Sequence, residues 1–151
     1  MEIRNTFEVR LITTQDAAYH EVLSLREEVL RKPLGLSVYK DDLNRETQDF
    51  ILTAWEAEQL VGCVILSPLT VSDIKLRAMA VVSKLQNRGI GRLLVTSAEE
   101  LAIEKGFEKI VLHARVAAKE FYIKLGYDTI GDEFIEVTLP HVNMQKLITK
   151  V

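Results

Sequence analysis

The spacing of apolar residues predicts a strand and then a helix at the start of the chain. Apolar and polar residues alternate from Phe7 to Ile12, as in a half-buried strand. From Gln15 to Arg31 the apolar residues recur at helical spacing, so one face of this helix is expected to be buried. The residues expected to cap this helix and to end it are Thr13 and Thr14 before it and Pro33 and Gly35 after it.

The rest of the chain continues to alternate between strands and helices. Phe50 to Ala57 and Leu60 to Leu69 are expected to form a hairpin that turns at Glu58 and Gln59. The later elements expected are a strand that ends near Val82, a helix from Gly89 to Lys105 that Gly106 ends, a strand from Lys109 to His113, a short helix from Val116 to Leu125 and two strands between Tyr127 and Leu147. Strands that meet helices on both faces imply an α/β or α+β layered fold.

A glycine-containing turn from Gln86 to Arg92 joins the strand that ends near Val82 to the helix that follows. Gly89 and Gly91 let the backbone approach a ligand without obstruction by side chains. The first amides of a helix have no acceptor within the helix, so they can donate hydrogen bonds to phosphate oxygens. The turn is therefore a candidate site for a pyrophosphate group.

Three cations near the same helix start strengthen this interpretation. Lys84, Arg88 and Arg92 oppose the positive end of the helix dipole, at a cost of roughly 0.3–1 kcal/mol each. A bound polyanion would reverse that penalty. Ordinary solvated arginines beside a loop remain the alternative interpretation.

Composition and charge limit the class of protein. A chain of 151 residues with 48% hydrophobic residues fits one domain with a normal core. The net charge of -3 argues against a general nucleic-acid binder, which needs a basic surface. No apolar run approaches the roughly 20 residues that cross a bilayer, and the N-terminus lacks a secretory pattern, so a cytoplasmic protein without membrane contact is expected.

Several other chemistries find little support in the sequence. Cys63 is the only cysteine, which excludes an internal disulfide, and its strand-like surroundings predict a buried, inert thiol. The three histidines are dispersed and the carboxylates lack ligand spacing, so no metal site is expected. Neither Ser67 nor Ser97 lies in a nucleophile elbow, which argues against a serine hydrolase.

A second segment, from Ala118 to Tyr127, follows the glycine turn, and together the two resemble the GNAT superfamily of N-acetyltransferases. In that family a Gln/Arg-x-x-Gly-x-Gly/Ala turn holds the pyrophosphate of acetyl-CoA, and a later helix carries an aromatic-Tyr-x-Lys-x-Gly-aromatic signature. Gln86, Gly89 and Gly91 match the first motif. The matches to the second motif are Phe121, Tyr122, Lys124, Gly126 and Tyr127.

The resemblance covers about Phe7 to Leu147 and carries expectations about fold and activity. It implies the GNAT fold, with a mixed, mostly antiparallel central sheet of six to seven strands and helices on both faces. It also implies an acetyl-CoA-dependent N-acetyltransferase that transfers the acetyl group directly to a primary amine of a small molecule or protein. Small acetyltransferases of this kind are often dimers, so the resemblance allows a homodimer, although the sequence shows no interface signature.

The tail of the chain resembles a bacterial subgroup of the superfamily whose members end in a Pro-His-x-x-Met segment. Pro140, His141 and Met144 match this segment. The first helix matches the Arg-x-x-Val part of the subgroup's pattern with Arg26 and Val29, although Leu30 replaces its aromatic residue. The subgroup does not supply the acceptor.

The resemblance assigns the cofactor site to two segments. The main chain of the fourth strand, at Met79, Ala80 and Val81, is expected to pair with the pantetheine arm. The residues expected around the pyrophosphate are Gln86, Arg88, Gly89, Ile90, Gly91 and Arg92. Where relatives often carry an asparagine that contacts the cofactor, this chain has Arg115, whose charge could instead meet a phosphate.

The resemblance also names an acid, and the chain offers several bases. Tyr122 is expected to protonate the departing thiolate, because a phenol with a pKa near 10 stays protonated at neutral pH. The amine needs a base, for which His113 and His141 are the leading candidates. The carboxylate alternatives are Glu136, Glu133 and Asp49, and His20 is expected to be exposed.

The acceptor and the class of activity stay open at this point. The loop between Gly35 and Gln48 carries Asp41, Asp42 and Glu46, which could form the rim of a pocket for a cationic acceptor. A different class of function is a non-catalytic acyl-CoA sensor or interaction module that has lost its acceptor site. A Rossmann-like nucleotide binder is a distant third, because the glycine turn follows several strands and the full Gly-x-Gly-x-x-Gly pattern is missing.

Overall fold

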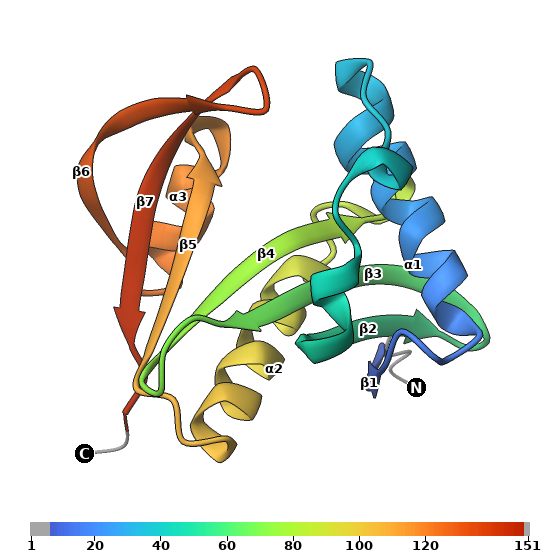
Figure 1. Ribbon diagram of the computed structural model, residues 1–151, viewed down its shortest axis with the longest axis horizontal. Coiled ribbons are helices and arrows are strands. Elements are labelled where there is room, and N and C mark those ends of the chain that lie inside the picture. Colours follow the sequence, from blue (N-terminus) through green and yellow to red (C-terminus); the bar gives the residue numbers. More distant parts are fainter. Residues whose placement is uncertain (1–6, 150–151) are drawn as a thin grey trace, which may run out of the picture.

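The computed structural model describes residues 7–149 and has one mixed seven-stranded sheet at its centre (Figure 1). The strands are β1 (Glu8–Ile12), β2 (Phe50–Glu56), β3 (Gln59–Pro68), β4 (Asp73–Val81), β5 (Lys109–Arg115), β6 (Asp128–Glu136) and β7 (Leu139–Leu147), in the order β1-β2-β3-β4-β5-β7-β6. Neighbouring strands are antiparallel except for the β4–β5 pair, which is parallel. The predicted mixed, mostly antiparallel sheet is confirmed.

Three α-helices and several single helical turns accompany the sheet. The helices are α1 (Ala18–Arg26), α2 (Ile90–Glu104) and α3 (Lys119–Lys124). A π-helical turn (Glu27–Arg31) continues α1, and 3-10 turns lie at Lys32–Leu34, Val38–Lys40, Asn44–Gln48, Ser83–Leu85 and Val116–Ala118. None of the helices among residues 7–149 is both long and apolar enough to cross a membrane.

The alternation of side chains along β2 explains why helices cover both faces of the sheet. Ile51 packs in a core with Tyr19 and Val22 of α1. Leu52, which points to the opposite face, packs in a second core with Leu94 of α2. Each face therefore has its own apolar core, and the predicted helices on both faces are confirmed.

The start of α1 differs from the prediction. The helix begins at Ala18 rather than at Gln15, and no side chain caps it. The residues before it form a turn of their own instead: the carboxylate of Asp16 accepts a hydrogen bond from the Thr13 amide at 2.8 Å. The predicted capping by Thr13 and Thr14 is therefore wrong, because this local turn uses the polar groups ahead of the helix.

Three other boundaries also shift. The hairpin turns at Ala57 and Glu58, since Gln59 already belongs to β3 and Ala57 takes a left-handed conformation. Strand β5 continues to Arg115, two residues beyond the predicted end. The short helix predicted from Val116 to Leu125 is a 3-10 turn followed by α3.

A β-bulge in β4 opens the middle of the sheet. Ala80 lies opposite Cys63 and Arg77 opposite Ile65, so Ala78 and Met79 share a single partner position on β3. Ala78 takes a left-handed conformation with φ of 54°. The bulge bends β4, and β4 pairs with β5 only over Asp73 to Lys75, after which the two strands diverge (Figure 1).

Candidate active site

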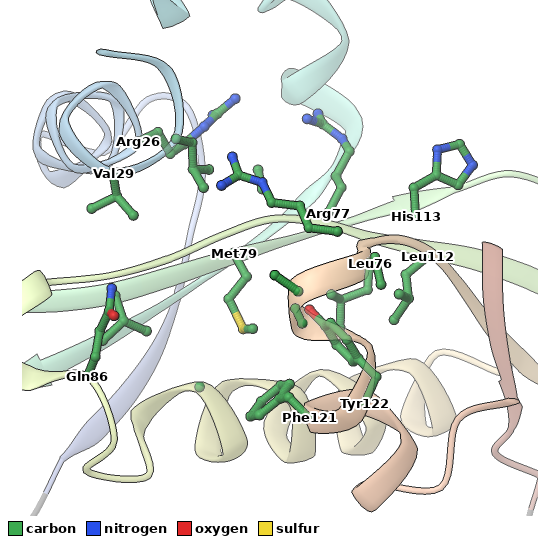
Figure 2. A pocket seen from close by; sticks show the side chains of 18 of the residues that line it. Arg26, Val29, Leu76, Arg77, Met79, Gln86, Leu112, His113, Phe121 and Tyr122 are labelled. Atoms are coloured by element: carbon green, nitrogen blue, oxygen red, sulfur yellow. The ribbon is translucent and has the colours of Figure 1, made fainter. Parts of the chain in front are cut away.

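A cleft of about 1090 Å³ lies where β4 and β5 separate. Its walls come from β4, β5, the first turn of α2, the α3 segment and the π-helical turn after α1. Figure 2 shows Met79 and the hydroxyl of Tyr122 projecting into the space between the strands and α2. The cleft therefore joins segments that are far apart in the sequence.

The first turn of α2 presents backbone donors at this cleft. Gly89 precedes the helix in a left-handed conformation, with φ of 85°, which a glycine adopts without strain. No side chain caps this end, and its first turn has no acidic residue. The Gly89 carbonyl accepts from the Leu93 amide at 3.0 Å, so the amides of Ile90, Gly91 and Arg92 precede the first intrahelical bond.

Gly91 keeps the space beside this turn open. A Cβ atom at this position would lie 3.4 Å from the Phe121 ring and 3.7 Å from the Met79 side chain. These are ordinary contact distances, so the fold itself tolerates a methyl group there. The glycine is needed only if something else must approach the backbone between Phe121 and Met79.

The backbone of β4 also faces the cleft in part. The Val82 amide donates to the Val61 carbonyl of β3 at 2.9 Å. Because backbone groups alternate in direction along a strand, the polar groups of Ala80 also face β3 and those of Met79 and Val81 face the opening. Beyond Lys75 no β5 residue pairs with them.

Most of the predicted site residues lie together around this cleft. Those that line it are Met79, Val81, Gln86, Gly89, Ile90, Gly91, Arg92, His113, Tyr122 and His141. Ala80 does not, because its side chain is buried in the core beneath α1. Arg88 does not either: its guanidinium lies 5.6 Å from the centre of the Phe7 ring. The roles of all these residues in catalysis or binding stay predictions.

Tyr122 is a buried phenol with its hydroxyl at the cleft. Its ring packs edge-on against Phe121 at 5.0 Å and Tyr127 at 5.7 Å between centroids. The hydroxyl makes no hydrogen bond to another residue of the described chain, and it is not sealed in the protein interior. Burial raises the pKa of Tyr122 to about 12, so the phenol carries its proton throughout the neutral range.

The two candidate bases lie on the other face of the strands from Tyr122. His113 alternates with Leu112 and Ala114, which are buried in the core beneath α2, and Figure 2 shows its ring on the side of Arg26 and Arg77. His141 is buried and stacks on Phe134 at 6.0 Å. His20 is exposed, as expected.

Hydrogen bonds fix the tautomers of both histidines. Nδ1 of His141 lies 2.8 Å from the Leu139 carbonyl oxygen, which only accepts, so Nδ1 carries the hydrogen. In the neutral ring, Nε2 is then a free acceptor. Nδ1 of His113 lies 2.9 Å from the Glu136 carboxylate, which orients that ring in the same way. Either Nε2 could receive a proton.

The acidic side chains of the loop between Gly35 and Gln48 do not line the cleft. Glu46 is buried and accepts two hydrogen bonds from Arg26, at 2.8 and 2.9 Å, and one from Tyr19 at 2.7 Å. Asp41 pairs with Arg31, and none of Asp41, Asp42 and Glu46 lines the cleft. The predicted loop therefore borders the cleft through Val38, but its carboxylates do not line it, since Glu46 is paired with Arg26 behind the wall.

Neighbouring cations and hydrogen bonds explain why the buried Glu46 has a lowered pKa. Burial alone would raise its pKa, but hydrogen bonds from Arg26 and Tyr19 and the charge of Arg77 together hold the pKa below its ordinary value. Asp49, a candidate base, accepts from Arg77 at 2.9 Å. These buried carboxylates are part of the wall that supports the cleft rather than groups that face it.

Two further residues considered in the sequence analysis, Cys63 and Glu133, lie outside the cleft. Cys63 is fully buried, which confirms the predicted burial, and this burial raises the pKa of its thiol to about 12. Glu133 is exposed on β6. Within residues 7–149, no three His, Cys, Asp or Glu side chains gather where they could hold a metal ion.

Sequence reasoning missed several cations of the cleft. Lys75 and Arg77 of β4 and Arg31 of the π-helical turn all line it. The signal was present for the β4 pair: Ile74 and Leu76 are apolar and buried, so the charged residues between them must share the opposite face. A strand whose cations all point one way is expected to border a polar space.

Comparison with known protein families identifies the family to which the chain belongs. The sequence model of the Acetyltransferase (GNAT) domain matches residues 13–148, so the chain belongs to the GNAT acetyltransferase family. It is 30% identical over 147 residues to the Bacillus subtilis protein YyaT, across 94% of this chain and 97% of that protein.

Solved structures share the fold at lower sequence identity. An acyl-CoA N-acyltransferase from Pseudomonas aeruginosa has a TM-score of 0.81 at 18% identity, with 93% of this chain and 99% of that one covered. A GNAT family acetyltransferase from Elizabethkingia anophelis with acetyl-CoA bound has a TM-score of 0.71 at 16% identity, with 95% and 99% covered. These matches concern the fold alone.

Proposed function

We propose that the protein is an acetyl-CoA-dependent N-acetyltransferase that transfers the acetyl group directly to a primary amine of a small molecule or protein. The observation that carries this proposal is the uncapped start of α2, which opens onto the same cleft as the separated edge of β4 and the Tyr122 hydroxyl. Membership of the GNAT family supports acetyl-CoA as the acyl donor. The cleft supports its binding at the start of α2 and along the open edge of β4.

The residues of the cleft fit coenzyme A. A diphosphate suits the amides of Ile90, Gly91 and Arg92, because they lack protein acceptors and lie at the positive end of a helix. The amide groups of a pantetheine arm suit the unpaired main-chain groups of Met79 and Val81. The volume of about 1090 Å³ is slightly above the usual range of roughly 300–1,000 Å³ for small-molecule sites, as suits a ligand as large as coenzyme A.

Acetyl-CoA supplies a thioester whose carbonyl carbon an amine can attack. Tyr122 holds a proton at its hydroxyl, where it can donate to a sulfur anion formed at the floor of the cleft. His141 or His113 takes a proton from the amine at Nε2, since Nδ1 is fixed as the donor in each ring. We favour His141, which follows Pro140 in the segment that resembles the bacterial subgroup.

The proposal is tested by ligand binding and turnover on the same sample. Acetyl-CoA should raise the melting temperature more than ATP or NAD does, and a thiol-release assay with a broad amine panel should show turnover. A larger shift with ATP or NAD would point to a nucleotide binder. A shift with CoA but no turnover on any amine would favour the non-catalytic sensor.

A further inference from the structure

Part of the cleft lies on the α1 face of the strands. We call this part the acceptor chamber and define it by Lys75, His113, Arg115, Glu136 and His141, all of which line the cleft. Arg115 lies directly opposite His141 in the β5–β7 register, so both side chains occupy the same face. Phe134 contacts the rings of both His113 and His141 on that face.

The carboxylates around this chamber already have partners within the protein. Glu136 is the only acidic residue among those that line the cleft, and it holds His113 at 2.9 Å. Behind the wall, Arg77 and Arg26 neutralise Glu46, and Arg77 also binds Asp49. A polycationic acceptor would therefore find no free carboxylate in the part of the cleft that the structure describes.

Two cations of the chamber, in contrast, have no carboxylate partner among residues 7–149. Lys75 and Arg115 line the cleft, and neither forms an ion pair with any residue from 7 to 149. Burial lowers the pKa of Lys75, with the charges of Arg77 and Arg45 acting in the same direction and that of Glu136 against it. An anion placed here would compensate for the lost hydration of the ammonium.

The other lining cations without an ion pair among residues 7–149 belong to the opposite side of the cleft. Arg92 lies in the first turn of α2, beside the proposed phosphate site, and Lys124 lies at the end of α3. Arg115, in contrast, is next to the ring of His141, whose Nε2 is free to accept a proton. A molecule with its anionic group on Arg115 would bring a nearby amine to that nitrogen.

We propose that the acceptor is an amine that carries an anionic group, a carboxylate or a phosphate, close to the amine that is acetylated. Arg115 binds the anionic group, Lys75 contributes to its binding, and the amine faces His141. This inference rests on the proposed acetyltransferase function and narrows its acceptor to α-amino acids and phosphorylated amines. It reverses the expectation of a cationic acceptor drawn from the acidic loop.

The test compares acceptors that differ only in the anionic group. Several L-amino acids are assayed beside their carboxamides, O-phosphoethanolamine beside ethanolamine, and spermidine serves as the polycation. The anionic member of a pair should have the higher kcat/KM by roughly tenfold or more, the range expected for a charge-assisted hydrogen bond. The amino-acid and phosphate pairs distinguish the two anions.

Variants of Arg115 and Lys75 then test whether these residues cause the preference for anionic acceptors. Arg115→Gln should remove most of the preference, and Lys75→Gln should reduce it, while the KM for acetyl-CoA stays within about twofold. Lys40→Gln removes the charge of an exposed lysine that does not line the cleft, so it should keep the preference.

Two results would overturn the inference while leaving the proposed function intact. One is turnover that favours the neutral or polycationic acceptors. The other is an Arg115→Gln variant that raises the KM for acetyl-CoA and keeps the acceptor preference, which would assign Arg115 to the cofactor. Absence of turnover with every amine would contradict the acetyltransferase proposal itself.

Discussion

Replacing Glu46 with glutamine tests whether the wall of the cleft depends on a buried charge network. Glu46 is 1% exposed and its partner Arg26 is 3% exposed. The Glu46→Gln substitution keeps the shape of the side chain but leaves the Arg26 guanidinium buried without its counter-charge. Breaking a buried pair in this way costs about 3–5 kcal/mol. That is a large part of the roughly 5–15 kcal/mol that stabilises a typical domain.

Urea unfolding followed by tryptophan fluorescence measures this loss. Trp55 is the only tryptophan and is buried, so its emission reports on the fold. With a slope of about 1–3 kcal/mol per molar urea, the midpoint should fall by more than about 1 M. The matched control is Asp41→Asn, which breaks the half-exposed pair with Arg31 and should cost only about 0–1 kcal/mol.

The pH dependence of stability and a double variant test whether the ionised Glu46 stabilises the folded protein. The lowered pKa of Glu46 means that its contribution to stability is full above pH 4.5, the ordinary value, and is lost as the pH falls through the lower value in the folded protein. The Glu46→Gln variant should lack this acid-dependent loss. Adding Arg26→Met should restore stability, because it removes the unpaired charge. Equal losses for Glu46→Gln and Asp41→Asn would refute the reasoning.

Three further predictions concern the cleft and the packing around it. Tyr122→Phe should lower kcat by roughly 10²–10⁴-fold with little change in the melting temperature, whereas unchanged turnover would remove Tyr122 from the role of acid. In the native enzyme, ionisation of Tyr122 should not lower kcat on the basic side of the pH–rate profile, because its pKa is about 12. Gly91→Ala should keep or raise the melting temperature, since alanine is favoured over glycine in a helix by about 1 kcal/mol, while the KM for acetyl-CoA rises. Gly62→Ala should instead destabilise the fold by about 1–3 kcal/mol in urea unfolding, because its Cβ would lie 3.0 Å from Ile90 and Leu94, and an unchanged midpoint would contradict the packing described here.

Local patterns predicted those parts of the fold that depend on neighbouring residues. The alternation in β2 and the helical spacing in α2 each report burial of one face, so these elements and the layered fold followed from the sequence. The glycine turn and Tyr122 were also predicted, and they line one cleft. Their roles still await an experiment.

Features set by distant contacts were not predictable in this way. The bulge of β4 requires Ala78 in a left-handed conformation, which an alanine rarely adopts and no local pattern signals. Glu46 looked like a surface residue because its partners, Tyr19, Arg26 and Arg77, lie 20 to 31 residues away. The charge of the cleft was therefore misjudged, although the alternation around Lys75 carried a usable signal.

A crystal structure with bound coenzyme A would test the central claim most directly. We predict that diphosphate oxygens accept hydrogen bonds from the amides of Gly91 and Arg92, at about 2.7–3.2 Å, and that the pantetheine arm lies between β4 and β5. Coenzyme A bound elsewhere, with no ligand atom at the start of α2, would contradict it.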